Sequence, residues 1–269
     1  MTNRLTAAFA APSRDHRAIL CPFVTAGYPS VDLLGPLLES LQQAGAGCIE
    51  LGIPFSDPIA DGPTIQESYR LALENGATVE RIFQAVEKIR RGRFSLPIMA
   101  MASFSIIFKH GTDAFAADCA QAGIDGLILP DVPLEEAPAV VATLERHNLK
   151  SSLLIAPTTP ADRREKIAVL CTGFIYYLSV TGITGERQSL PPDLPMNLKM
   201  LRTMTSQPIC VGFGISRRDQ VAEISRLADG VIVGSAIIKT ISRELATAAP
   251  DVPAAVGAMA ADLAAGLKK

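Results

Sequence analysis

Short runs of apolar residues recur along the chain, and each is followed by a stretch in which apolar residues return every three or four positions. The runs are continuously apolar rather than alternating, which is typical of strands that are buried on both faces. The stretches between them carry the period of amphipathic helices. The pattern predicts eight strands, at Ala18–Thr25, Cys48–Ile53, Pro97–Ala102, Gly126–Pro130, Ser151–Ala156, Gly173–Leu178, Pro208–Gly212 and Gly230–Gly234.

Strand–helix units that repeat without a break in composition indicate one domain over residues 1–269, folded as a (β/α)8 TIM barrel. Residues 3–10 predict an extra N-terminal helix ahead of the first strand. The main alternative is an open, doubly wound sheet, but no Gly-x-Gly-x-x-Gly run follows the first strand, which favours the barrel. The predicted helices after the strands are Val31–Gln43, Thr64–Glu74, Thr78–Arg91, Thr112–Gln121, Leu134–His147, Pro160–Leu170, Asp193–Thr205, Ser216–Leu227, Ser235–Ala246 and Pro253–Leu267.

The composition narrows the class of protein. Hydrophobic residues make up 48% of the chain, charged residues 19%, and the formal net charge is −2. No basic excess is present to drive binding to nucleic acid or to a membrane surface, and no apolar run approaches the length of a membrane span. The five cysteines are scattered without a Cys-x-x-Cys pair, which indicates reduced core residues of a cytoplasmic protein.

Carboxylates gather around the second predicted strand. Glu50 interrupts an otherwise apolar strand, and Asp57 and Asp61 follow in the next loop. Glutamate is seldom fully buried without a partner, so Glu50 is a candidate catalytic group. Asp61 is a second candidate, although aspartates beside Pro and Gly are commonly turn residues. Thr64, three residues before Glu67, predicts a capping-box helix start.

Glycines follow the last strands and predict a phosphate site. Gly214 follows strand seven, and Gly234 follows strand eight, each just before an expected helix start, at Ser216 and Ser235. Helix N-termini carry unpaired N–H groups and attract phosphate, and barrels often bind phosphate at this position. The polar loop after strand six, which contains Gly185, is long enough for a lid. The alternative is that these residues form tight turns and helix caps.

The remaining strand ends and the excluded chemistries narrow the reaction. Histidines without metal-ligand spacing argue against a zinc-dependent aldolase, and the lack of a lysine at a strand end argues against a Schiff-base aldolase. General acid–base chemistry on a phosphorylated substrate remains. Tyr176 either contacts the substrate or is a core residue. Apolar residues at the strand ends suggest a slot for a flat ring, formed by Phe23, Ile65, Met101, Leu129 and Phe213.

Four runs carry a family resemblance: LGIPFSDPIADGPTIQ, GITGERQSLPPDL, VGFGIS and GVIVGSAII. They resemble the tryptophan synthase alpha subunit family, and the match extends from about Leu20 to about Lys239. The resemblance implies a lyase of tryptophan biosynthesis that cleaves indole-3-glycerol phosphate to indole and glyceraldehyde 3-phosphate, without metal or cofactor. It also implies a partner, the tryptophan synthase beta subunit, in an alpha2-beta2 tetramer.

The resemblance also implies roles for individual residues. Glu50 matches the general acid–base, which protonates C3 of the indole and takes the proton of the glycerol hydroxyl. Asp61 matches the aspartate that binds the indole N–H and stabilises the positive ring. Tyr176 matches a tyrosine lining the site, and Thr184 matches a lid threonine that closes over Asp61. The residues that match the phosphate grip are Gly185, Gly214, Gly234 and Ser235.

The chain departs from the family pattern after strand three. Ser103 and Ser105 stand where the family usually has Tyr and Asn, in a loop that helps to dock the beta subunit, and Val180 stands where some members have Arg. These changes leave open a stand-alone lyase that releases free indole. A non-catalytic regulatory partner that binds a phosphorylated ligand is another alternative, against which the two carboxylates argue. The apolar slot and the PFSDPIADGPTIQ run argue against a sugar-phosphate isomerase.

Overall fold

A computed structural model describes residues 3–15, 18–58, 61–179, 190–212 and 214–267, with residues 11–15 described by their backbone alone. Parallel strands close into a barrel in chain order, and β1 pairs with both β2 and β8. The strands are β1 (Ile19–Thr25), β2 (Ile49–Gly52), β3 (Ile98–Met101), β4 (Gly126–Leu129), β5 (Lys150–Ile155), β6 (Ile175–Leu178), β7 (Ile209–Gly212) and β8 (Gly230–Val233). The predicted barrel is confirmed, and each strand falls within one residue or so of its expected run.

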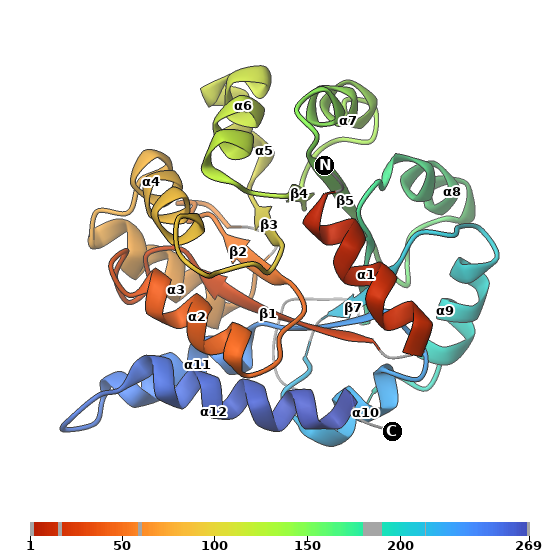
Figure 1. Ribbon diagram of the computed structural model, residues 1–269. Helices are drawn as coiled ribbons and strands as arrows, with labels where there is room; N and C mark the ends of the chain where they lie inside the picture. The colour runs from red at the N-terminus through yellow and green to blue at the C-terminus, as the bar shows by residue number, and fades with distance from the viewer. Residues whose placement is uncertain (1–2, 16–17, 59–60, 180–189, 213, 268–269) are drawn as a thin grey trace.

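Helices surround the barrel on its outer side; α1 crosses one end of the barrel, and α12 lies on the outside against α2 and α11 (Figure 1). The helices of the described residues are α1 (Arg4–Asp15), α2 (Leu34–Gln43), α3 (Pro63–Glu74), α4 (Val79–Arg90), α5 (Phe104–His110), α6 (Thr112–Ala122), α7 (Ala137–Arg146), α8 (Ala161–Leu170), α9 (Leu194–Arg202), α10 (Arg218–Ile224), α11 (Ser235–Leu245) and α12 (Val252–Ala264), followed by a 3-10 turn at Ala265–Leu267.

Strand residues divide between two apolar clusters, because successive side chains of a strand point to opposite faces. One cluster fills the barrel and includes Cys21, Met99 and Ile128. The other lies between the barrel and the helices and includes Leu20, Leu127 and Leu129. Both faces of each strand are therefore buried, which is why the strands read as continuous apolar runs rather than as alternating ones.

The N-terminal helix closes the end of the barrel where the strands begin. Leu5 and Phe9 of α1 belong to the cluster inside the barrel, and the rings of Phe9 and Phe174 lie 6.0 Å apart. The side chain of Asn3 donates to the carbonyl oxygens of Asp125 and Asn148 at 3.0 and 3.1 Å. Figure 1 shows α1 crossing this end of the barrel. Apolar side chains of α1 therefore close the barrel interior at the end where the strands begin.

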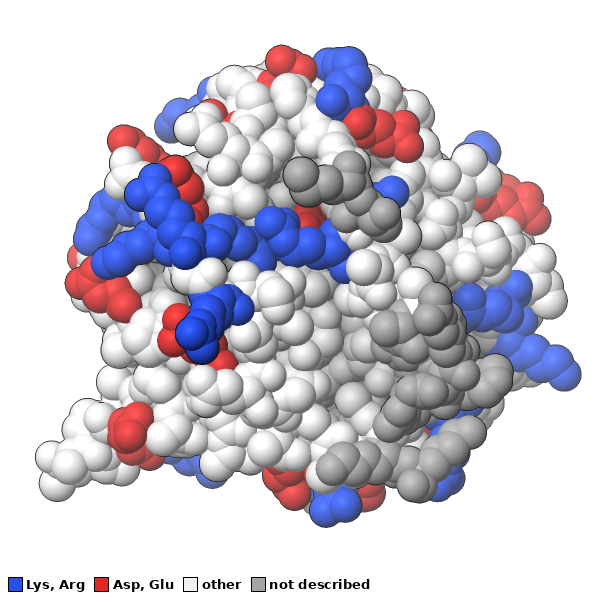
Figure 2. Space-filling view, in the orientation of Figure 1, with Lys and Arg blue, Asp and Glu red and all other residues white. Residues whose placement is uncertain are grey.

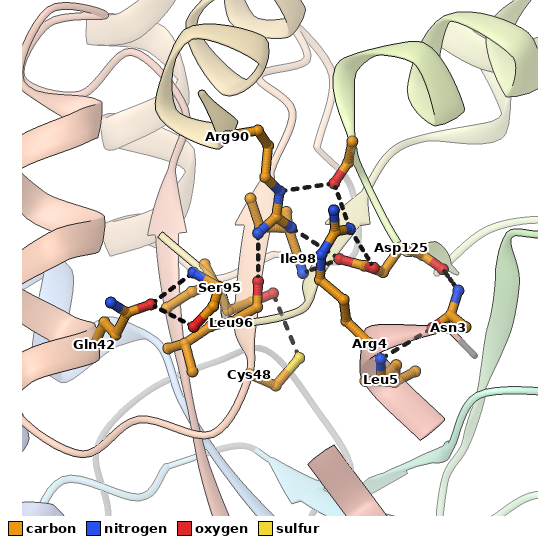
Figure 3. A network of polar contacts seen from close by, with 12 residues as sticks. Asn3, Arg4, Leu5, Gln42, Cys48, Arg90, Ser95, Leu96, Ile98 and Asp125 are labelled. Carbon is orange, nitrogen blue, oxygen red and sulfur yellow. Dashed lines mark hydrogen bonds and ion pairs between the residues drawn. The ribbon is translucent and has the colours of Figure 1, made fainter. Parts of the chain in front are cut away.

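A carboxylate fastens α1 to the barrel. Asp125, which is 3% exposed, accepts from Arg4 Nη1 at 2.9 Å and from Arg90 Nη2 at 2.8 Å (Figure 3). The backbone N–H of Ile98 donates to the same carboxylate at 2.9 Å. The network joins α1, α4, β3 and the start of β4, and a buried carboxylate with this many donors is fully paired.

Two local predictions are wrong, and each has a physical reason. The segment after β3, expected as a loop, forms α5, whose first residues are capped by Ser103 and Asp131. The capping box at Thr64 does not form, because α3 begins one residue earlier at Pro63, with no side-chain cap. Proline has no backbone N–H, so at the first helical position it leaves no donor that a cap would have to pair. The carboxylate of Glu67 pairs with Arg70 instead.

The surface mixes charges of both signs. Figure 2 shows a band of basic side chains across the face on which α1 and α4 lie, with acidic side chains at its borders. The last turn of α4 contains two basic residues, Lys88 and Arg90. Within the described ranges, no helix combines the length and the apolar character that a bilayer crossing requires.

Candidate active site

A cavity of about 640 Å³, the part that opens to solvent included, lies where the strands end. Side chains from six of the strands reach it, and the loops after β2, β4, β7 and β8 complete its wall. Active sites of (β/α)8 barrels occupy this end. The lining residues are Phe23, Glu50, Asp61, Ile65, Met101, Pro130, Leu154, Tyr176, Gly214, Ile215, Ile232, Gly234 and Ser235.

Glu50 reaches the cavity from β2, where its backbone lies between Phe23 of β1 and Met99 of β3. Glu50 is 2% exposed, and its Oε2 has no hydrogen-bond partner among the described residues. Burial, and after it the charge of Asp61, raises the pKa of Glu50 from 4.5 to about 8. At neutral pH the side chain therefore holds a proton and faces a cavity in which it can donate that proton.

Asp61 lies in the loop between β2 and α3, where two hydrogen bonds fix its backbone. Its N–H donates to the carbonyl of Pro58 at 3.1 Å, and its carbonyl accepts from Gln66 Nε2 at 2.8 Å. Burial, and after it the charge of Asp131, raises the pKa of Asp61 from 3.8 to about 6. Near pH 7 the cavity thus holds one protonated and one ionised carboxyl group, which is the arrangement that separates an acid from an anionic stabiliser.

Two tyrosines lie beside the carboxylates. Tyr176 of β6 lines the cavity, and a Cβ on Gly212 would come within 2.7 Å of its hydroxyl, so only glycine leaves room for this ring. Tyr69 of α3 is buried, with its ring centroid 6.5 Å from that of Phe23. Burial first, and then the charges of both carboxylates, raises the pKa of each tyrosine well above 10. Both hydroxyls therefore stay neutral.

The end of the cavity beside α11 suits an anion. α11 begins at Ser235 with Gly234 as its N-cap; its first turn has no side-chain cap and no acidic residue. The unpaired N–H groups and partial positive charge of such a helix start attract phosphate. Gly214 lines the same cavity with a φ of 82°, a backbone conformation that glycine adopts without strain. Three of the predicted grip residues thus line one cavity.

The helix start predicted at Ser216 is wrong, because α10 begins at Arg218. The N–H groups of Ser216 and Arg217 both donate to the side-chain oxygen of Gln220, at 3.0 and 3.2 Å. These two donors are therefore already paired within the loop. On the side of β7, the prediction of an anion site rests on Gly214 alone.

One apolar residue of the predicted slot lies elsewhere, and three predicted residues lie outside the described ranges. Leu129 belongs to the outer cluster between barrel and helices, because its neighbour Pro130 takes the position that faces the cavity. Thr184, Gly185 and Phe213 fall outside the described residues, and their roles stay predictions.

Several residues that complete the cavity were not expected from the sequence. Leu154, Ile215 and Ile232 are apolar side chains of its wall, and Pro130 closes the side of β4. A continuous apolar strand gives no alternation from which to tell inward from outward positions.

The family model described as tryptophan synthase alpha chain matches residues 9–265. The chain belongs to the tryptophan synthase alpha chain family. The tryptophan synthase alpha chain of Geobacter sulfurreducens is 42% identical over 241 residues, which cover 90% of this chain and 91% of the relative.

Solved structures of this family have the same fold. The tryptophan synthase alpha subunit of Legionella pneumophila superposes with a TM-score of 0.91 at 33% identity, covering 99% of both chains. A chain of Mycobacterium tuberculosis tryptophan synthase gives a TM-score of 0.89 at 33% identity, again covering 99% of both. The alpha chains of tryptophan synthase cleave indole-3-glycerol phosphate, so the predicted family and the predicted carbon–carbon lyase class are confirmed.

Proposed function

We propose that this alpha chain cleaves indole-3-glycerol phosphate by general acid–base catalysis, with Glu50 as the acid–base and Asp61 as the anion that stabilises the ring. The observation that carries the proposal is the pair of carboxyl groups in one cavity, one with its pKa near 8 and the other near 6. At neutral pH this pair offers a proton donor and a negative charge side by side.

In the first step Glu50 donates its proton to C3 of the indole ring. The ring becomes a cation, and its N–H donates a hydrogen bond to the carboxylate of Asp61, whose negative charge stabilises the positive ring. Glu50 suits the donor role because its buried Oε2 has no other hydrogen-bond partner among the described residues.

In the second step the bond between C3 and the glycerol carbon breaks, and its electron pair returns to the ring to restore neutral indole. The ionised Glu50 takes the proton of the glycerol hydroxyl on the same carbon, which becomes the aldehyde of glyceraldehyde 3-phosphate. Glu50 ends the cycle protonated, as it began, so one side chain serves as acid and then as base.

The two ends of the substrate are held by different parts of the cavity. The start of α11 at Gly234 and Ser235, with Gly214, would receive the phosphate. Apolar side chains on the other walls, Phe23, Ile65, Met101, Leu154 and Ile232, would sandwich the flat ring. Phosphate binding then fixes the distance between the ring and Glu50, which is the positioning that catalysis needs.

The partner in this proposal is a tryptophan synthase beta subunit. Phe108 of α5 is 73% exposed on the segment where the family docks that subunit, and its ring lies 6.0 Å from that of Phe104. An exposed aromatic side chain such as that of Phe108 is more typical of an interface than of a free surface, which supports an alpha subunit over a stand-alone lyase. Buried free thiols at all five cysteines support the cytoplasmic location.

The test is indole release from indole-3-glycerol phosphate by this chain alone, and then with a tryptophan synthase beta subunit added. We expect a weak rate that rises strongly with the partner. A high rate that ignores the partner would replace the proposed subunit by a stand-alone lyase. Absence of indole in both cases would overturn the proposed catalysis.

A further inference from the structure

Asp131 lies directly after Pro130, one of the residues that line the cavity, and both of its carboxylate oxygens are occupied. The hydroxyl of Ser103 donates to Oδ2 at 2.6 Å, and the backbone N–H of Phe104 donates to Oδ1 at 2.7 Å. Two hydrogen bonds to one carboxylate fix its orientation as well as its position. The carboxylate of Asp131 is thus held in place, although Asp131 is exposed.

The anchor of Asp131 is the start of α5. Ser103 is the N-cap of this helix, and its hydroxyl also accepts from the N–H of Ser105 at 3.3 Å. The ends of β3 and β4 meet here, because Met101 pairs with Ile128 in the sheet. The loop after β4 and the first turn of α5 are therefore joined at the rim of the cavity.

The charge of Asp131 acts on Asp61. Burial is the larger cause of the raised pKa of Asp61, and the charge of Asp131 is the second. The other titratable groups around Asp61 are Glu50 from β2, Tyr69 from α3 and Tyr176 from β6. Burial keeps these three protonated at neutral pH. Among these groups, Asp131 is therefore the one whose negative charge raises the pKa of Asp61.

We propose that Asp131 is a positioning residue of the lyase reaction: its carboxylate, held by Ser103 and Phe104 at the start of α5, keeps a negative charge beside Asp61 and makes Asp61 a stronger acceptor for the ring N–H. The proposal rests on the function proposed above. Ser103 stands where the family usually has tyrosine, and in this proposal it acts on the reaction by holding Asp131. It does so although it lies outside the lining of the cavity. The negative charge counts most when the ring becomes a cation, so it acts on turnover rather than on substrate binding.

The test compares Asp131→Asn with wild type in the full chain, with the beta subunit present. Asn keeps an acceptor for the N–H of Phe104 and removes the charge. We expect the acid limb of kcat/KM to move to lower pH by about half a unit or more, because a like charge has been removed from beside Asp61. We expect kcat to fall about threefold to tenfold, with KM nearly unchanged.

Carbon-13 NMR titration of the Asp61 carboxyl in the ligand-free chain gives a readout that does not depend on activity. We expect the same downward shift in Asp131→Asn, with the Asp61 signal assigned from an Asp61→Asn sample. The matched control is Asp162→Asn, an exposed aspartate in the first turn of α8, which should leave the titration unchanged.

Two further variants test the anchor itself. Ser103→Ala removes one of the two donors to Asp131, and we expect a smaller shift of the same sign. Ser103→Thr keeps the hydroxyl and should restore the wild-type titration. If Ser103→Ala matches wild type in the titration, the anchor has no part in holding the charge, and the proposal is wrong.

The outcomes separate this proposal from the proposed function. If wild type releases no indole, the proposed function fails, while the NMR titration still decides whether Asp131 acts on Asp61. If wild type is active and Asp131→Asn titrates like Asp162→Asn, the positioning role fails alone. A loss of kcat with an unmoved acid limb would also overturn it, since that result would mark Asp131 as a helix cap only.

Discussion

Glu50 and Asp61 line the same cavity from β2 and from the loop that follows it, and the charge of Asp61 raises the pKa of Glu50. Asp61 is therefore part of the environment that keeps Glu50 protonated. The pair differs from a salt bridge, because the two groups hold opposite protonation states at one pH rather than opposite charges.

Glu50→Gln should lower the turnover of indole-3-glycerol phosphate by at least about a hundredfold, because the acid–base group is lost while the side-chain shape is kept. Steady-state indole release measures it, and circular dichroism checks the fold. Glu39→Gln, at an exposed position of α2, is the control and should keep wild-type activity. Survival of activity in Glu50→Gln would refute the acid–base role.

Activity should fall as the pH drops through about 6, because Asp61, with its pKa raised to about 6, must be ionised to stabilise the cationic ring. It should fall again above about 8, where free Glu50 loses the proton that it donates. Asp61→Asn should lose most of its activity at every pH. Asp57→Asn, a change in the same loop, should keep the wild-type profile of kcat/KM; a fully active Asp61→Asn would reduce Asp61 to a turn residue.

Stability should depend on pH through Glu50. Its pKa is raised in the folded state, so the folded chain binds the proton more tightly, and stability is lost as pH rises from about 4.5 to about 8. Gln does not titrate. The free energy of unfolding of Glu50→Gln, measured in urea, should therefore rise relative to that of wild type by on the order of 4 kcal/mol between pH 5 and pH 9. A difference that stays constant over this range would contradict the raised pKa.

Gly234→Ala should weaken phosphate binding without harming the fold. A Cβ at Gly234 would meet Phe23 at 3.6 Å, an ordinary contact, but it would crowd the backbone at the start of α11. We expect KM to rise about tenfold, which corresponds to about 1.4 kcal/mol of lost binding. Inhibition by glycerol 3-phosphate should weaken in parallel. The control is Gly35→Ala in α2, and equal KM values for both variants would place the phosphate elsewhere.

Asp125→Asn should destabilise the chain by about 3 kcal/mol, because it leaves the buried guanidinium of Arg90 without its counter-charge. Arg4→Gln removes a pair whose arginine is 45% exposed and should cost less than about 1 kcal/mol. Urea unfolding measures both. Since the network lies at the opposite end of the barrel from the cavity, kcat should stay at its wild-type value in each variant.

Some features of the fold and the site were predictable from the sequence, and others were not. The barrel was predictable, because strands buried on both faces read as apolar runs between helical ones. A continuous apolar run does not show which side chains point into the barrel, so Leu129 was expected in the slot that Pro130 lines instead. The start of α10 was misplaced because Gln220, four residues on from Ser216, supplies the cap that the serine was expected to provide. α5 was missed because part of its cap, Asp131, is remote in sequence.

The closure of the barrel by α1 has a consequence for the chain while it is being synthesised. Asn3 docks on the carbonyls of Asp125 and Asn148, and Phe9 docks on Phe174. During synthesis α1 therefore waits for Asn148 and Phe174, which are translated more than a hundred residues after it. Until these partners are made, the apolar face of α1 stays exposed on the nascent chain. An exposed apolar face is a binding site for chaperones and a starting point for aggregation.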